Sequence, residues 1–404
     1  MRLDRFRWVY CQLDNLRRCM PSSIRKALDE LPVTLDDTYE RILQNIPKQK
    51  WQHAHRLFQC MVAARRPLRV EELAEMFAIG FGPSSASNLV EGWRPSNPEE
   101  AVFSACSTLI TIIYAGGSKI VQFSHFSVKE YLTSDRLQTS EVTNIRQFYI
   151  SLEPAHTILA RACLAVLLQL EENVGKERLA TTFPLALYAA ANWVDHAKFG
   201  NVASEIQDVM GDLFHPMKPH LRAWILIHDV DDYGFGSVTT PSPTLALFYA
   251  ALCGFDSLAR QLIIKHGLDV NGSVRNAYTP LHAASRGGHV NVAQALLDYG
   301  ADVNAANKYN ETALFFARYH KHIEFMRFLL KNGANPNIGS DRSDASFLWE
   351  AVSSGNLDLT RLFLDYGADV KIRDKDGSTP FQRATGAGHH DIAQLLLDRG
   401  AERK

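Results

Sequence analysis

Paired histidines are the first residues of this 404-residue chain that could do chemistry. Zinc sites often use two histidines from one face of a helix. His53 and His55 lie two positions apart in a stretch with helical periodicity, so their side chains would point in different directions. Two other close pairs are His320 with His322 and His389 with His390. Neither pair has a C-x-x-C or H-E-x-x-H motif beside it. The sequence therefore predicts no metal site.

Gly116-Gly117-Ser118-Lys119 contains the residue types that hold phosphate in nucleotide-binding loops. Such a loop needs G-x-x-x-x-G-K-[ST] between a strand and a helix, so that backbone N–H groups surround the phosphate. The chain has no such motif, and Gly116–Lys119 falls in a predicted hairpin turn. Cys106 has no recognisable histidine partner motif, and no G-x-S-x-G is present. We therefore expect a non-catalytic protein without a cofactor or a bound nucleotide.

Bulk composition narrows the class of partner. A net charge of −1, with 46% apolar and 22% charged residues, does not favour nucleic acid or an anionic membrane. The six cysteines form no C-x-x-C and read as buried thiols of a reducing compartment. The first ten residues lack an apolar signal-peptide core, and the apolar run Ile158–Leu170 is interrupted by Arg161. We expect a cytoplasmic protein, with the nucleus as the alternative.

The C-terminal part of the chain contains a sequence repeat. The fold of this repeat must position any functional residue there. Glycines recur every 33 or 34 residues, at Gly267, Gly300, Gly333, Gly367 and Gly400. In the unit that begins at Thr279, Pro280 suits the first helical position, and Ala284 is small enough to allow close helix packing. Gly300 follows a second apolar helix, at a position that often needs a left-handed backbone. One such unit cannot bury its own apolar faces, so the sequence predicts a stack.

Thr279-Pro280-Leu281-His282-Ala283-Ala284 fits the T-P-L-H-x-A pattern, and the chain over about 241–404 resembles the ankyrin-repeat family. The resemblance implies an α-solenoid of about five units, with the first (Pro243–Asn271) and the last acting as caps. It also implies that proteins bind on the concave surface of the stack. Two openings depart from the pattern, since 310–314 lacks the proline and the histidine and 346–349 lacks nearly all of it.

The finger turns that precede the first helix of each unit are the expected binding surface, and their tyrosines and arginines are typical interface residues. We expect Tyr278 and Tyr309 to flank one contact with the partner, with Arg286 and Arg318 beside it. The full set of expected partner-binding residues is Arg275, Tyr278, Arg286, Lys308, Tyr309, Arg318, Tyr319, Arg342 and Lys375.

Residues 48–135 are predicted to contain three helices, with a polar loop at 80–98, followed by a β-hairpin. This is the order of elements in a winged helix. The stretches 29–43, 67–79 and 123–137 resemble the winged-helix region that follows the NACHT domain of fungal intracellular receptors, and 184–197 resembles their connector. The resemblance implies the C-terminal portion of such a receptor without its nucleotide-binding domain. The expected fold is mainly α, with a helical segment at 1–47, the winged helix, a connector at 136–240 and the repeats.

A winged helix also raises DNA binding as a function. From Pro95 to Gly117 the chain has no lysine or arginine, whereas phosphate and base contacts depend on both. The leading hypothesis is a non-catalytic scaffold or receptor-like fragment that binds a protein through its ankyrin surface. The alternatives are a DNA-associated regulator and an accessory protein of a fungal metabolic pathway.

Overall fold

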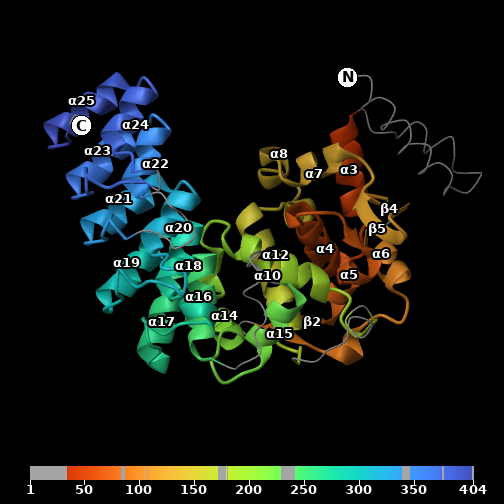
Figure 1. The fold of residues 1–404 in the computed structure, drawn as a ribbon. Coiled ribbons are helices and arrows are strands. Elements are labelled where there is room, and N and C mark those ends of the chain that lie inside the picture. The colour runs from red at the N-terminus through yellow and green to blue at the C-terminus, as the bar shows by residue number, and fades with distance from the viewer. Residues whose placement is uncertain are drawn as a thin grey trace, which may run out of the picture. The chain divides into compact units, whose positions relative to one another are not determined.

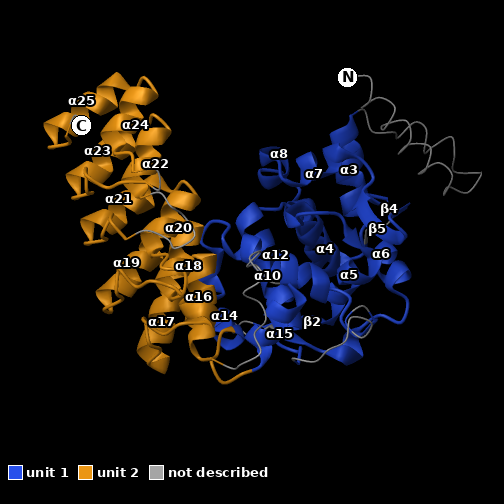
Figure 2. Ribbon diagram, in the orientation of Figure 1, with its two compact units in different colours: residues 1–213, 219–236 blue, residues 214–218, 237–404 orange. Residues whose placement is uncertain are grey.

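The computed structural model describes residues 34–82, 87–106, 108–171, 179, 181–228, 242–338, 346–374 and 377–402, except the side chains of Ser87 and Cys106. The chain divides into two compact units, which are coloured in Figure 2: unit 1 is 1–213 with 219–236, and unit 2 is 214–218 with 237–404. Helices dominate both units, which confirms the expected mainly-α class (Figure 1). Most of the expected N-terminal segment lies outside the described residues, and the first described helix is α3 (Leu35–Gln44).

Unit 1 contains the helices and the hairpin expected of a winged helix. The helices are α4 (Trp51–Ala63), α5 (Val70–Ala74), which continues as the 3-10 turn η3 (Glu75–Ala78), and α6 (Pro98–Cys106). Strand β4 (Ile110–Ala115) pairs with β5 (Ser118–Phe123), which also pairs with β1 (Leu68–Arg69), so the sheet order is β1-β5-β4. Gly116 and Gly117 form the hairpin turn at φ 55° and 78°, where glycine avoids a steric penalty.

The sequence suggested a polar loop at 80–98, but part of this stretch forms β-strands. Strand β2 (Ile79–Phe81) pairs with β3 (Ser87–Leu89) in antiparallel register, with Ile79 opposite Leu89. A 3-10 turn, η4 (Glu91–Trp93), follows. The strands are three residues long and include Gly80, Ser87 and Asn88, so no alternation of apolar and polar residues marks them.

Further helices complete unit 1. They are α7 (Phe126–Leu132), α8 (Asp135–Gln138), α9 (Thr143–Arg146), α10 (Leu152–Leu167), α12 (Ala186–Ala197), α13 (Val202–Glu205), α14 (Gln207–Leu213) and α15 (His220–Ile227). Helix α10 packs against α4 and α12, and its apolar residues are buried between them. In the described ranges no helix has both the length and the apolar composition needed to cross a bilayer.

Buried polar residues of the connector form hydrogen bonds with one another. His196 is fully buried and His156 nearly so. His156 Nδ1 lies 2.8 Å from His196 Nδ1, and the hydroxyl of Tyr188 lies 2.9 Å from His196 Nε2. Burial, and then the nearby charge of His156, lower the pKa of His196 to about 3, so this imidazole is neutral in the fold.

Unit 2 stacks five helix pairs. They are α16 (Thr244–Cys253) with α17 (Asp256–His266), α18 (Pro280–Gly287) with α19 (Val290–Asp298), α20 (Ala313–Tyr319) with α21 (Ile323–Lys331), α22 (Phe347–Ser353) with α23 (Leu357–Asp365), and α24 (Pro380–Gly386) with α25 (His390–Asp398). Figure 1 shows the first helices of the pairs in one column and the second helices in another. We call them the inner and the outer helices.

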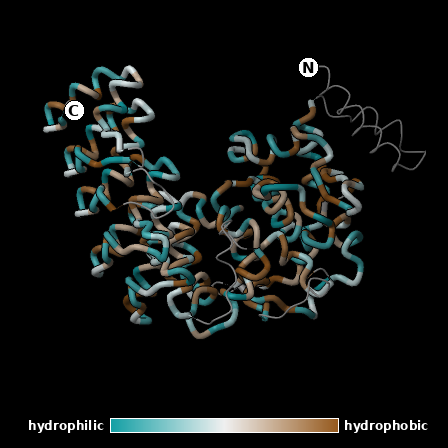
Figure 3. Tube along the Cα trace, in the orientation of Figure 1, coloured by the Kyte–Doolittle hydropathy of each residue, from teal (hydrophilic) through white to brown (hydrophobic). Residues whose placement is uncertain are grey.

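Amphipathic helices hold the stack together, and hydrophobic and hydrophilic residues alternate along the trace of each pair (Figure 3). Ala284 is fully buried, as predicted, in the contact of α18 with its neighbouring inner helices α16 and α20. The last pair has exposed polar residues such as Gln382 and Asp391. In the first pair, residues 245–251 of α16 are all buried. The roles of both pairs as caps stay predictions.

A ladder of asparagines fixes the repeat register. Asn271 donates from Nδ2 to the carbonyl of Gly300 at 3.0 Å and accepts from the amide of Asp302 at 2.8 Å. Two more asparagines repeat both bonds one unit further on, and these are Asn304 and Asn337. The ladder ends at Lys371, whose side chain instead pairs with Glu402 at 3.0 Å. Each loop is thus tied to the next, which explains the even spacing of the glycines.

Candidate protein-binding surface

The expected partner-binding residues occupy several different environments. Arg275 and Lys308 are exposed in their finger turns, and Tyr309 is half-buried. Tyr319 ends α20 with 55% of its surface exposed. Arg286 and Arg318 are partly exposed on the inner helices α18 and α20. Two further residues lie outside the described part of the chain, and they are Arg342 and Lys375.

The expectation that Tyr278 is an exposed contact is wrong, because its side chain is only 3% exposed. Its ring packs against His282 and Phe316, with centroid distances of 5.8 and 5.6 Å. Its hydroxyl lies 3.5 Å from a carboxylate oxygen of Glu311. The physical reason lies in the next repeat, since Phe316 supplies an apolar surface and Glu311 a polar partner.

His282 connects the same two repeats. Its Nδ1 accepts from the amide of Thr279 at 3.0 Å and caps α18, while its Nε2 lies 3.0 Å from the carbonyl of Glu311. Burial lowers the pKa of His282 to about 4, so the ring is neutral and Nε2–H donates. The finger turns are also joined directly, by a 3.0 Å bond from the amide of Lys308 to the carbonyl of Asn276. These contacts make the turns a fixed part of the surface.

An aromatic and charged group on and beside α20 forms the most developed surface feature of unit 2. Phe315 and Tyr319 stack with centroids 6.3 Å apart and planes 18° apart, and Tyr319 contacts His320 at 5.1 Å. The guanidinium of Arg318 lies 5.2 Å from the ring of Phe315. We call this group the α20 cluster, and its members are Phe315, Arg318, Tyr319, His320, Phe347 and Glu350.

Helix α22 contributes the last two members of the α20 cluster. Arg318 lies 5.6 Å from the ring of Phe347 and forms an ion pair with Glu350. The side chain of Arg318 is only 14% exposed, and burial lowers its pKa, although a guanidinium stays charged. Burial and then the charge of Arg286 lower the pKa of His320, so Arg286 of α18 lies close by. Three inner helices therefore present one rigid group of rings and charges, which is the type of surface that anchors protein partners.

Sequence reasoning placed Arg318 and Tyr319 on this surface but missed Phe315, His320, Phe347 and Glu350. Phe315 and Tyr319 are four residues apart in one helix, a spacing that places their side chains side by side. That signal could have been found. The role of Phe347 and Glu350 could not, because 346–349 departs from the repeat pattern.

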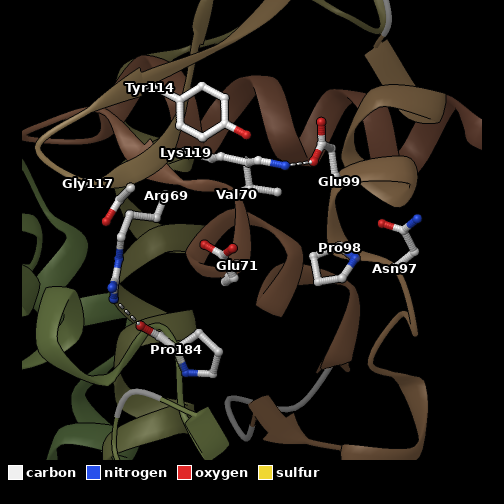
Figure 4. A pocket seen from close by; sticks show the side chains of 11 residues that line it. Arg69, Val70, Glu71, Asn97, Pro98, Glu99, Tyr114, Gly117, Lys119 and Pro184 are labelled. Atoms are coloured by element: carbon white, nitrogen blue, oxygen red, sulfur yellow. Dashed lines mark hydrogen bonds and ion pairs between the residues drawn. The ribbon is translucent and has the colours of Figure 1, made fainter.

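A cleft of about 500 Å³ in unit 1 is the other candidate site (Figure 4). Tyr114, Lys119, Glu99 and Glu71 lie around it, with Arg69 beside Pro184. Lys119 Nζ is held by a carboxylate oxygen of Glu99 at 2.5 Å, and Arg69 donates to the carbonyl of Pro184 at 3.2 Å. Lys119 follows the hairpin turn at Gly116 and Gly117, and its ammonium is paired with Glu99.

The other residues singled out for chemistry have structural surroundings. His53 stacks on Phe77 at 5.4 Å, while His55 lies 3.2 Å from the carbonyl of Tyr149. Three cysteines are buried thiols as expected, and they are Cys60, Cys163 and Cys253. Burial raises the pKa of Cys60 to about 12, so its reactive thiolate is scarce at neutral pH. Cys11, Cys19 and the side chain of Cys106 lie outside the described residues.

Comparison with known families agrees with both parts of the fold. Residues 247–340 match the family model described as ankyrin repeats (3 copies), and 348–397 match ankyrin repeats (many copies). Residues 39–143 match the winged helix domain of GPI inositol-deacylase. The chain is therefore an ankyrin-repeat protein with a winged-helix domain ahead of its repeats.

A curated fungal protein is similar to most of the chain. It is the azaphilone pigments biosynthesis cluster protein L of Monascus ruber, which is 31% identical over 288 residues. The similarity covers 66% of this chain and 59% of the relative. The suspected resemblance to fungal receptors of the NACHT type is consistent with this relative and with the winged helix and repeats.

Proposed function

We propose that this chain is a non-catalytic interaction protein that binds a protein partner through its inner helices and finger turns, with the α20 cluster at the centre. One observation carries the proposal: Tyr319 is 55% exposed although it stacks on Phe315 beside the fixed guanidinium of Arg318. A large ring that is already ordered loses little side-chain entropy when a partner covers it. Tyrosine and arginine are also the residue types most often found at binding hot spots.

The relative supports a narrower version of this function. Its printed name refers to a cluster for pigment biosynthesis. By similarity, the partner of this chain would be a protein of a fungal metabolic pathway, and the chain would act as an accessory factor in the cytoplasm.

Regulation through DNA receives less support from the described winged helix. Helix α6 carries Glu99 and Glu100 in its first turn and has no lysine or arginine, and Lys119 of the hairpin pairs with Glu99. Retention of the chain on duplex DNA that falls steeply with salt would favour this alternative over a protein partner.

Site-specific photo-crosslinking tests the protein-binding proposal. The photoreactive amino acid p-benzoylphenylalanine is placed at position 319 of the full chain and, as the matched control, at position 299 on the outer side. Tyr299 is a suitable control because it is also exposed, at 41%. In a fungal lysate we expect one protein to crosslink from position 319 and not from 299. A partner that crosslinks from 299 alone would contradict the proposed surface.

A further inference from the structure

Strand β4 forms one edge of the sheet in unit 1, because the strand order is β1-β5-β4. Just before this strand, the amide of Ser124 donates to the carbonyl of Leu109 at 2.9 Å. Along an antiparallel pair, residues that bond to the neighbouring strand alternate with residues whose backbone groups point away from it. Counted from Leu109, the residues of β4 that point away from β5 are Ile110, Ile112 and Tyr114.

The outer edge of β4 is open to another strand. In the described ranges, none of these three outward residues has a hydrogen-bond partner for its backbone groups. Among the described elements, β5 is also the only one that β4 contacts extensively. Natural edge strands commonly avoid pairing through a charge, a proline or a bulge. The sequence of β4 is ITIIYA and its register with β5 is continuous, so it has none of these three features.

The opposite edge of the same sheet is closed. Strand β1 forms that edge and is two residues long. Arg69 lies opposite Ile120 of β5, and its amide donates to a carboxylate oxygen of Glu72 at 2.8 Å. A further strand can therefore add at β4 but not at β1. Pairing between copies of the sheet would then end at two copies and would not continue into a fibre.

We propose that two copies of this chain pair through the outer edge of β4, antiparallel and about a two-fold axis at Ile112. This inference goes beyond the protein binding proposed for unit 2 and does not depend on it. In this register Ile112 faces Ile112 of the second copy, and Ile110 faces Tyr114. All three outward residues then exchange backbone hydrogen bonds with the second copy. Three strands from each copy form one sheet of six, which is a common size.

The side chains of β4 suit pairing with a second copy. Thr111 of each copy lies opposite Ile113 of the other, and both side chains are half-exposed. Cross-strand pairs of β-branched residues stabilise antiparallel strands. The ring of Tyr114, which is 77% exposed, lies beside Ile110 of the second copy. Since β4 carries no charged residue, no like charges meet when the strand faces itself.

The area of the contact sets its strength. A strand of six residues is about 20 Å long, so the edge alone buries less than the roughly 1,000 Å² of a stable interface. We therefore expect a weak dimer that forms at high micromolar concentrations of the chain.

Sedimentation equilibrium of the full chain, up to about 0.2 mM, measures this dimer. Thr111 and Ile113 are the positions to change, because they lie on the face of the sheet opposite the buried Val121. The double variants Thr111→Lys/Ile113→Lys and Thr111→Glu/Ile113→Glu should each raise the Kd at least tenfold, since like charges then face one another. An equimolar mixture of the two should restore dimerisation, because each lysine then faces a glutamate.

The matched control is Ile120→Lys/Gln122→Lys, which places the same charges on the same face of β5, one strand away from the edge. This control should dimerise like the parent, and far-UV circular dichroism checks that every variant folds.

Disulfide crosslinking tests the register without added charge. Ile112→Cys places two thiols in one bonded pair, with Cα atoms about 5.5 Å apart, so a mild oxidant should link two chains. Tyr114→Cys is the control, because the two residues at position 114 lie about 13 Å apart along the paired strands and should not be linked.

Four results overturn the proposal. The parent chain stays monomeric, the double variants dimerise as well as the parent, the mixture dimerises no better than its components, or chains are linked from position 114 and not from 112.

Discussion

His282 of one repeat and Glu311 of the next are joined by a 3.0 Å hydrogen bond between imidazole Nε2 and a backbone carbonyl. The other ring nitrogen of His282 accepts from the amide of Thr279, so both nitrogens are occupied only when the ring is neutral. A single buried side chain thus caps a helix and ties two repeats together.

Acid should destabilise the repeats through His282. Its pKa is about 4 in the folded chain, below the ordinary value of 6.5, so the unfolded chain binds more protons between these values. Its contribution is fully present above pH 6.5 and decreases by about 1 kcal/mol per pH unit as the pH falls toward 4. Urea unfolding of the full chain at several pH values measures this slope.

The matched variant is His282→Gln, since the last repeat uses Gln382 in the same way and its Oε1 accepts from the amide of Thr379 at 2.8 Å. Glutamine does not titrate, so the slope of stability against pH should be smaller in the variant. His196 titrates in both proteins, so its effect cancels in the difference between the two slopes. Equal slopes in parent and variant would show that His282 does not couple pH to stability.

Ala284→Asp should unfold the repeats at a much lower temperature. The side chain of Ala284 is fully buried, so an aspartate there would be an unpaired carboxylate in an apolar interface, at a cost of several kcal/mol. Calorimetry of the full chain gives the shift. Asn291→Asp introduces the same side chain on the exposed side of α19 and should leave the melting curve close to that of the parent. A curve for Ala284→Asp that matches this control would remove Ala284 from the core.

Ala277→Gly should stabilise the chain by roughly 0.5–1 kcal/mol. The backbone at Ala277 has φ 62°, a left-handed conformation that a Cβ atom disfavours. Ala306 lies in the next finger turn without a positive φ, and Ala306→Gly should be neutral or destabilising. The urea midpoint should rise in Ala277→Gly and stay unchanged or fall in Ala306→Gly, and a loss of stability in Ala277→Gly would contradict backbone strain at this position.

Most of the repeat fold could be predicted from the sequence, because the 33-residue period reflects contacts that each unit makes with a similar neighbour. The asparagine ladder and the burial of Ala284 both follow that period. Tyr278 could not be placed, since its burial depends on Phe316, where α20 departs from the pattern. The β2–β3 pair was missed for a related reason: three-residue strands with glycine and asparagine carry too little periodicity to be recognised.

The chain should bind neither ATP nor GTP at micromolar concentration. Lys119 sits beyond a glycine hairpin turn rather than at a helix N-terminus, and its ammonium is paired with Glu99. Titration calorimetry of the full chain with each Mg-nucleotide checks this expectation. Stoichiometric binding that is lost in Lys119→Ala would show that the unit 1 cleft is a nucleotide site after all.

Tyr278 and Tyr319 should separate stability from partner binding. Tyr278→Ala removes a ring that packs on His282 and Phe316, and its 3% exposure leaves nothing for a partner to contact, so we expect a loss of about 3 kcal/mol in stability. Binding by the fraction that remains folded should change little. Tyr319→Ala should leave the urea midpoint nearly unchanged and weaken the partner at least tenfold, about 1.4 kcal/mol.

The two effects are measured on the same preparations, with urea unfolding for stability and surface plasmon resonance against the crosslinked partner for affinity. Tyr299→Ala is the control, because it removes an exposed tyrosine from the outer side and should alter neither quantity by much. If Tyr319→Ala binds as tightly as Tyr299→Ala, the α20 cluster is not the anchor. The exposed finger residues Arg275 and Lys308, which do not depend on the stacked ring, would then be the next positions to change.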